Sequence, residues 1–118
     1  MEIIECEDFL VYGQNDFFIG DIKYSIEENN KVFINLFQVY EEYREFGLGK
    51  EMLIDMISYF KKEGYDEILL EAIPLNSSMS LTSLISFYMK SGFEYLYKGT
   101  NYLKLNLKKD SYGRFNFS

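Results

Sequence analysis

Histidine is missing from this sequence, and cysteine and proline occur only once each. The lack of histidine removes the usual general base of serine and cysteine hydrolases and the commonest ligand of zinc and iron sites. The single cysteine, Cys6, cannot form an internal disulfide, which favours a reducing compartment. With no histidine to raise its thiolate fraction, Cys6 is better explained by packing than by nucleophilic chemistry. We therefore expect no metal site and no histidine-dependent hydrolase.

Basic segments and long apolar runs are also scarce. The acidic residues 1–8 lack the basic start and apolar core of a signal peptide, and no apolar run reaches membrane-spanning length. Together with the single cysteine, this predicts a cytoplasmic protein with no membrane partner. Aspartate and glutamate number 19 against 12 lysines and arginines, which gives a net charge of −7. Such a charge argues against nucleic acid as a partner and favours cationic ones, although plain solubility explains it equally well.

What the sequence does contain describes one folded domain, residues 1–118. Hydrophobic residues make up 47% of the chain, and its eleven tyrosines and eleven phenylalanines exclude a disordered segment. At 118 residues the chain is long enough for one core and too short for two.

The first third of the chain has the pattern of β-strands. Residues 9–12, 17–28 and 31–39 are β-prone runs. They are separated by turn residues at 13–16 and by Asn29-Asn30, which tolerate positive φ. Apolar residues occupy both faces of the last run, which predicts a central strand covered on both sides.

Two polar residues interrupt that last run. A polar side chain in a covered strand needs a hydrogen-bonding partner, so Asn35 either makes a hydrogen bond in the core or faces a pocket. Gln38, near the end of the strand, poses the same question.

Arg44, Gly47 and Gly49 follow, at the point where the chain turns into a helix. Two glycines one residue apart allow a tight bend and expose backbone N–H groups. A helix N-terminus leaves its first N–H groups unpaired, and its dipole favours negative charge, so this stretch predicts a phosphate or pyrophosphate site. Its spacing fits neither the dinucleotide-binding glycine motif nor the P-loop.

The rest of the chain alternates helices and strands. A helix of about fifteen residues follows the glycines, and the apolar run 66–74, ended by the only proline, reads as a second buried strand. Strand, helix and strand form a right-handed βαβ unit with parallel strands. Ser80 caps a second helix. The remaining elements are a closing hairpin of residues 93–98 and 102–107, and the unpatterned tail 108–118.

Two motifs and the order of elements resemble one family. Arg44-x-x-Gly47-x-Gly49 resembles the acyl-CoA loop of the GCN5-related N-acetyltransferases (GNAT), and Phe87-Tyr88-Met89-Lys90-Ser91-Gly92-Phe93 resembles the end of that family's last helix. The order β-β-β-α-β-α-β-β also resembles the GNAT fold, an α/β (α+β) protein with a mixed central sheet covered by helices. The resemblance covers residues 17–107, without the family's usual N-terminal helix pair. It implies an N-acetyltransferase that uses acetyl-CoA as co-substrate.

The resemblance also implies where acetyl-CoA binds. In the family, the strands that correspond to 31–39 and 67–74 splay apart, and the pantetheine lies in the gap. Backbone groups of one strand would bind pantetheine amides, N–H groups of the glycine loop would bind the pyrophosphate, and Arg44 and Lys50 would add positive charge. The implied cofactor-binding residues are Phe37, Gln38, Val39, Arg44, Phe46, Gly47, Leu48, Gly49, Lys50, Asn76 and Phe87.

Two residues are candidates for catalysis. Tyr88 resembles the family tyrosine that faces the sulfur, so it is the candidate general acid for the departing thiolate; alternatively it is a core tyrosine on an apolar helix face. In some members of the family, a glutamate early in the strand before the glycine loop acts as the general base. Phe33 stands at that position here. Glu71 is the better candidate base, because burial in a strand would raise its pKa. A solvated Glu71 with water as the proton relay is the competing view.

The acceptor side departs most from the family. Glu45-Phe46 stands where relatives often carry basic residues, and no helix pair walls the acceptor site. An open acceptor side suggests a bulky substrate, such as a lysine or N-terminus of a folded protein, or a site completed by a second copy of the chain. The expected partner is an amine acceptor, either a small cationic molecule or a protein. Acidic residues could steer a cationic amine there, namely Glu27, Glu28, Glu41 and Glu42.

The alternative function is an inert domain that binds acyl-CoA or a protein partner through the same groove. Very short relatives of this shape occur on phage and mobile elements, where host proteins can be the target. Both functions need Gly47 and Gly49, and only the enzyme needs Tyr88 and a base.

Overall fold

The structure, a computed structural model, describes residues 2–5, 9–14 and 17–108. The predictions for Cys6, for the turn residues Asn15 and Asp16 and for residues 109–118 of the tail lie outside this part of the chain. Gly13 and Gln14, predicted as turn residues, belong to a strand. Within it, no helix is long and apolar enough to cross a membrane.

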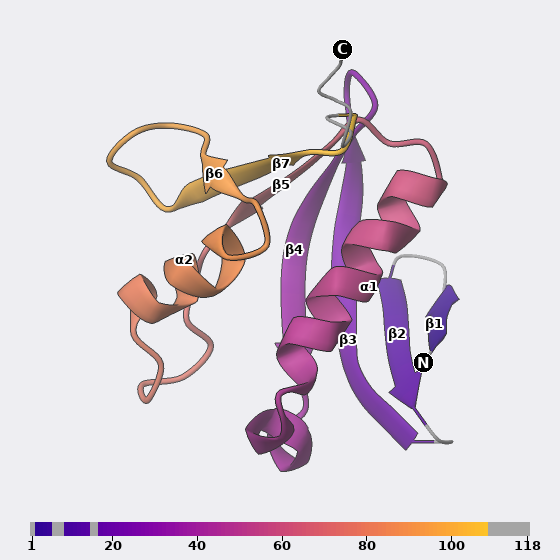
Figure 1. Cartoon of the computed structure of the whole chain (residues 1–118), viewed down its shortest axis with the longest axis vertical. Helices are drawn as coiled ribbons and strands as arrows, with labels where there is room; N and C mark the ends of the chain where they lie inside the picture. The colour runs from indigo at the N-terminus through magenta and orange to yellow at the C-terminus, as the bar shows by residue number, and fades with distance from the viewer. Residues whose placement is uncertain (1, 6–8, 15–16, 109–118) are drawn as a thin grey trace.

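One mixed sheet of seven strands and two α-helices make up the described residues (Figure 1). The strand order is β1-β2-β3-β4-β5-β7-β6, in which β4 and β5 are parallel and every other pair is antiparallel. The elements are β1 Glu2–Glu5, β2 Phe9–Gln14, β3 Phe17–Glu27, β4 Lys31–Val39, the 3-10 helix η1 Glu41–Phe46, α1 Leu48–Lys62, β5 Glu67–Glu71, α2 Leu81–Met89, β6 Glu94–Tyr95 and β7 Tyr102–Asn106.

The predicted α+β class and the parallel strands on either side of α1 are confirmed. Asn29 and Asn30 adopt φ values of 63° and 61°, as the turn prediction requires. Four details differ. An additional strand, β1, pairs with β2, and η1 stands where a simple glycine turn was expected. The strand β5 ends at Glu71, three residues before Pro74, and β6 has only two residues.

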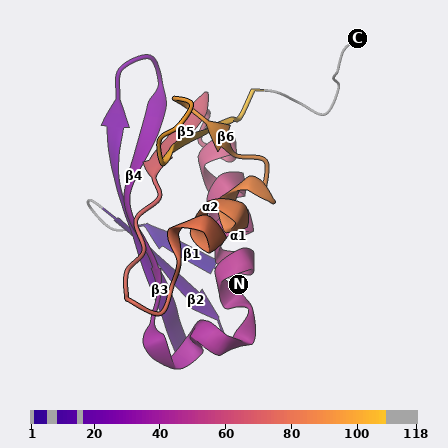
Figure 2. The same ribbon diagram turned by 90° about the vertical axis from the view of Figure 1, so that its left-hand side faces the viewer.

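The core lies between α1 and one face of the sheet. Met52, Met56 and Phe60 of α1 are fully buried, and they pack in one cluster with sheet residues such as Leu10 and Ile22. Figure 2 shows both helices on the same side of β3 and β4. The prediction that β4 is covered on both faces is therefore wrong for the described residues. We call the side without helices the open face.

Asn35 is explained by this open face. Its side chain is exposed and donates a hydrogen bond from Nδ2 to Ser25 Oγ over 2.6 Å. Neither of the two predicted environments, a core hydrogen bond or a pocket, is present. The register between β3 and β4 also shifts here, because Tyr24 pairs with Ile34 and Lys23 with Leu36. Asn35 is thus the extra residue of a β-bulge, which bends its strand.

The bulge coincides with the point where β4 and β5 separate. Their parallel register runs from Lys31 opposite Glu67 to Ile34 opposite Leu70 and goes no further. An ion pair between Lys31 and Glu67, 3.3 Å long, lies at the paired end. Beyond Asn35 the two strands splay apart, as predicted, and the gap between them holds the site described next.

Candidate functional site

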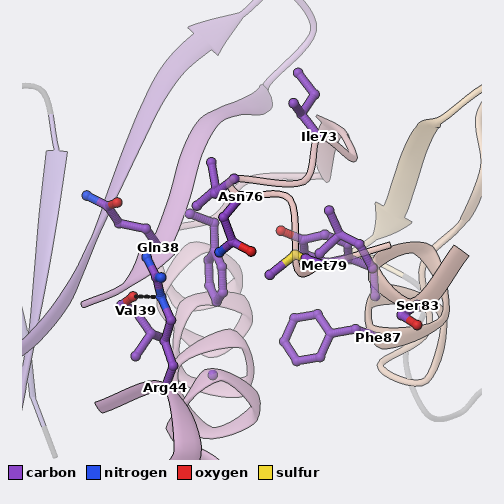
Figure 3. A pocket seen from close by; sticks show the side chains of 13 residues that line it. Gln38, Val39, Arg44, Ile73, Asn76, Met79, Ser83 and Phe87 are labelled. Atoms are coloured by element: carbon purple, nitrogen blue, oxygen red, sulfur yellow. Dashed lines mark hydrogen bonds between the residues drawn. The ribbon is translucent and has the colours of Figure 1, made fainter. Parts of the chain in front are cut away.

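A cavity of about 290 Å³ occupies the gap beside the part of β4 that lies beyond its pairing with β5 (Figure 3). Its walls come from β4, from the first turn of α1, from α2, and from the loop that follows β5. Most predicted cofactor residues meet here. The lining residues are Phe37, Gln38, Val39, Arg44, Gly49, Ile73, Leu75, Asn76, Met79, Ser83, Leu84, Phe87 and Tyr88.

The glycine stretch borders the cavity at Gly49. After η1, Gly47 takes a left-handed conformation with φ 71°, which glycine adopts without steric cost. Helix α1 then begins at Leu48, and no side chain caps its N-terminus, so its first N–H groups remain available. A Cβ on Gly49 would lie 3.7 Å from Val39 and 3.8 Å from Phe87, so β4 and α2 both pack close to this turn. This is the geometry of an anion site.

Arg44 and Lys50, the two predicted cations, lie in different places. Arg44 lines the cavity and donates a hydrogen bond from Nε to the carbonyl oxygen of Val39 over 2.9 Å. Its guanidinium is therefore held against the end of β4. Lys50 is exposed in the first turn of α1 and lines a second, neighbouring cavity instead. The backbone of Phe46 ends η1, and Leu48 is half-buried against the core.

Gln38 turns its side chain away from the cavity centre. Figure 3 shows it directed away from Phe87. Its Nε2 donates to Asp21 Oδ1 on β3 over 3.0 Å, and the hydroxyl of Tyr40 donates to Asp21 Oδ2 over 3.3 Å. Burial, followed by the charge of Asp21, raises the pKa of Tyr40. The contribution of Gln38 to the gap is therefore its backbone.

Tyr88 is the most buried polar group of the cavity, with 6% of its surface exposed. Its ring packs edge-on against Phe37, Phe87 and Phe93, at centroid distances of 6.1, 5.2 and 5.5 Å. Among the described residues, its hydroxyl has no hydrogen-bonding partner. Burial raises its pKa well above the usual value, so the hydroxyl keeps its proton. A buried hydroxyl without a partner calls for an explanation beyond core packing.

Glu71 and Asn76 differ from Tyr88 in their surroundings. Glu71 ends β5 opposite Tyr102, is half-buried rather than buried, and does not line the cavity. Because neighbouring strand residues alternate and Leu70 is buried beneath the helices, Glu71 points to the open face. Asn76 lines the cavity, and its Oδ1 accepts a hydrogen bond from the Ser78 N–H over 3.0 Å.

Five cavity residues were not predicted, although three of them carried a signal. The signal of Ile73 and Leu75 is that two large aliphatic residues flank the only proline, between two elements, and the structure leaves them 56% and 45% exposed. Leu84 belongs to the apolar stripe of α2. Nothing in the sequence indicated Met79 or Ser83.

Comparisons with known proteins agree with this geometry. The acetyltransferase (GNAT) family matches residues 3–93. No curated protein sequence matches the chain. The solved anti-CRISPR protein AcrVA5 is 30% identical, and the match covers 73% of this chain and 88% of that one, with a TM-score of 0.60.

Two further solved structures share the fold. The PaiA N-acetyltransferase of Thermoplasma acidophilum, in complex with coenzyme A, is 27% identical over 83% of this chain and 59% of its own, with a TM-score of 0.62. The ribosomal-protein-S18-alanine N-acetyltransferase of Escherichia coli is 17% identical over 96% of this chain and 77% of its own, with a TM-score of 0.65. The chain belongs to the acetyltransferase (GNAT) family.

Proposed function

We propose that this chain acetylates a primary amine of a protein, either a lysine side chain or an N-terminus. The observation that carries the proposal is the open face of the sheet. In the described residues no helix covers β3 and β4 on that side, so an amine on a large molecule can reach the gap between β4 and β5. Acetyl-CoA supplies the acetyl group as a thioester.

The gap fits acetyl-CoA in two respects. The β4 edge that faces away from β3 is not paired with β5 beyond Ile34, so backbone groups of Phe37, Gln38 and Val39 can bind the pantetheine amides. The uncapped start of α1 offers the N–H groups of Leu48, Gly49 and Lys50 to the pyrophosphate.

Tyr88 is the proposed general acid. Its hydroxyl lies in the cavity, keeps its proton because burial raises its pKa, and has no other partner among the described residues. It can therefore donate a hydrogen bond, and then its proton, to the sulfur as negative charge develops there. General acids typically contribute about 10²- to 10⁴-fold to a rate.

Glu71 is the proposed base, with a water molecule as a second route for the proton. A lysine amine has a reference pKa of about 10.4, so removing its proton near neutral pH costs about 4 to 5 kcal/mol. Glu71 lies at the end of β5, where the strands part, and points to the open face. The base and the acid would then act from opposite sides of the gap.

Charge and relatives both support a protein acceptor. Glu41 and Glu42 are exposed at the start of η1, next to the end of β4, so they can attract a cationic surface there. Glu27 and Glu28 are also exposed, but they lie at the opposite, paired end of β4. AcrVA5 is an anti-CRISPR protein, and the E. coli enzyme acts on an alanine of a ribosomal protein. A protein of the CRISPR machinery is therefore one acceptor to test.

The test compares acceptors of different size. The protein is incubated with isotope-labelled acetyl-CoA and one acceptor at a time. The acceptors are spermidine, a lysine-containing peptide, and folded proteins that include a CRISPR effector. Mass spectrometry and scintillation counting then give kcat/KM for each. We expect a folded protein to be acetylated at least about tenfold more efficiently than spermidine, which corresponds to about 1.4 kcal/mol. Faster acetylation of spermidine would contradict a protein acceptor, and no transfer to any amine would favour the inert acyl-CoA-binding domain.

A further inference from the structure

An exposed aromatic ring lies on the open face near the start of β3. Phe18 is 61% exposed, although it is a large apolar residue within a strand. Tyr12 of the neighbouring strand points to α1, because its hydroxyl donates to Asp55 Oδ2 over 3.0 Å, so the next residue, Gly13, points to the open face. Phe18 pairs with Gly13, and its ring lies 3.9 Å from the place of a Cβ on that glycine. Phe18 therefore points to the open face as well.

Tyr40 extends this aromatic surface. Its backbone N–H donates to the carbonyl oxygen of Ile19 over 2.8 Å, which places Tyr40 beside the residue that follows Phe18. Its hydroxyl donates to Asp21 Oδ2 over 3.3 Å. Asp21 alternates with the buried Ile22, so it points to the open face, and the hydrogen bond brings the Tyr40 ring to the same face. Two aromatic side chains thus lie on the open face at this end of the sheet.

Two carboxylates follow the aromatic rings. Glu41 and Glu42 come directly after Tyr40 in the first turn of η1, and both are exposed. Among the described residues neither forms an ion pair, and Arg44, the cation of η1, lines the cavity instead. Figure 1 shows η1 and the start of β3 at the same end of the molecule. The aromatic–acidic platform, as we call this surface, consists of Phe18, Tyr40, Glu41 and Glu42.

Local structure explains only part of this platform. The dipole of η1 favours acidic residues in its first turn, so Glu41 and Glu42 have a local explanation. Phe18 has none, because an exposed ring forgoes the free energy that burial would give. Aromatic rings next to carboxylates bind arginine and lysine side chains, whose stems pack on the rings and whose charges pair with the carboxylates. The combination fits a basic protein surface, and the net charge of −7 attracts one.

We propose that the aromatic–acidic platform docks a basic surface of the acceptor protein at a distance from the reacting amine. This inference rests on the protein acceptor proposed above. The platform shares the open face with Glu71, the proposed base. Glu71 follows Leu70, which pairs with Ile34, so Tyr40 lies five residues further along the sheet, at about 16 Å for 3.3 Å per residue. A folded protein spans this distance, whereas a short peptide around the acetylated lysine does not.

The first experiment compares one lysine in two contexts. It measures kcat/KM for the folded protein that is acetylated best in the acceptor comparison, and for a peptide of about five residues around the same lysine, which reaches about 7 Å on either side. Phe18→Ser should lower kcat/KM for the folded protein at least about tenfold through KM, with kcat unchanged, and leave the peptide unaffected. Phe17→Ser is the matched control, because Phe17 is 62% exposed and strand alternation points it away from the open face.

The second experiment measures docking without acetyl transfer. The probe is a fluorescent peptide of alternating arginine and leucine with a blocked N-terminus, which has no primary amine to acetylate. In fluorescence anisotropy, Phe18→Ser and the double variant Glu41→Gln/Glu42→Gln should each bind it at least about fivefold more weakly than the wild type. Glu27→Gln/Glu28→Gln removes the same charge at the opposite end of β4 and should bind as the wild type.

The outcomes separate the docking site from the proposed function. Equal probe binding by the wild type and Phe18→Ser would overturn the docking site, and so would an equal loss with Phe17→Ser or a loss of peptide acetylation with Phe18→Ser. Probe binding that depends on Phe18 in a chain that acetylates no protein would keep the docking site and refute the protein acceptor. A wild-type dimer in sedimentation that Phe18→Ser dissociates would assign the platform to a second copy of the chain and overturn the proposal.

Discussion

Strand β4 has two halves with different neighbours. From Lys31 to Ile34 it is hydrogen-bonded to β3 on one side and to β5 on the other. Beyond Asn35, in the described part of the chain, it keeps β3 as its only strand partner, and its other edge borders the cavity. We call these the paired half and the splayed half. One inserted residue, Asn35, separates the half that is paired on both sides from the half whose second edge borders the cavity.

The side chains of the two halves follow this division. In the paired half, Val32 and Ile34 are buried in the core. In the splayed half, Phe37 and Val39 line the cavity. Unpaired backbone groups at a strand edge must bind water or another strand-like partner. The comparison therefore predicts that changes in the splayed half affect binding and catalysis, whereas changes in the paired half affect stability.

Tyr88→Phe should have the largest effect, because Tyr88 packs against Phe37 of the splayed half and offers the cavity its buried hydroxyl. We expect kcat to fall by about 10²- to 10⁴-fold with little change in the Kd of acetyl-CoA, since only a proton donor is removed. Steady-state kinetics and calorimetry give the two values. Tyr65→Phe is the control, because Tyr65 packs against Phe60 under α1, away from the cavity, and should leave kcat unchanged. A Tyr88→Phe enzyme with wild-type kcat would remove Tyr88 from the mechanism.

Ile34→Ala should act on stability instead. Ile34 is 5% exposed in the paired half, and truncation of a buried isoleucine costs about 2 to 5 kcal/mol of unfolding free energy. Urea denaturation measures this loss, and the protein that remains folded should bind acetyl-CoA with an affinity within about twofold of the wild type. Leu36→Ala, at a half-buried position beyond the bulge, should cost less stability. A loss of affinity without a loss of stability in Ile34→Ala would contradict the division of β4.

Alkaline pH should have the smallest effect. Burial raises the pKa of Tyr88 in the folded protein above its unfolded value of about 10. The folded state then holds this proton more tightly, so its contribution to stability is present below about pH 10 and is lost as the pH rises further. The loss is at most about 1.4 kcal/mol per pH unit. Urea denaturation of the wild type and of Tyr88→Phe at about pH 9 and 11 should show a steeper decline for the wild type, and parallel declines would refute the shift.

The sequence predicted those features that depend on local chemistry. The helix after the glycines and the two parallel strands have strong local signals, and the structure confirms them. Gly47 takes the left-handed conformation, whereas Gly49 lies within α1. Tyr88 was found through a motif, and its buried position in the cavity is new information from the structure. The splay was expected from the family, whereas the Asn35 bulge that accompanies it was not.

The features that sequence reasoning missed depend on distant partners. Strand β1 has four residues and exists because β2 pairs with it. The sequence does not decide whether the Gln38 side chain makes a hydrogen bond in the core or faces a pocket. Its partner, Asp21, lies on β3, seventeen positions earlier in the chain. In the sequence, Lys90 is only part of a helix-end motif. Lys90 and Lys50 line the same cavity because α2 lies against the start of α1, and the sequence alone does not predict this arrangement.

Amide NMR during a titration with acetyl-CoA tests the division of β4 most directly. With isotope-labelled protein, we expect the largest chemical-shift changes at residues 36–39 and 47–50, where backbone groups would bind the pantetheine and the pyrophosphate. Residues 31–34, which are already paired on both sides, should change little. Largest changes at 31–34, or no changes at saturating acetyl-CoA, would contradict the site.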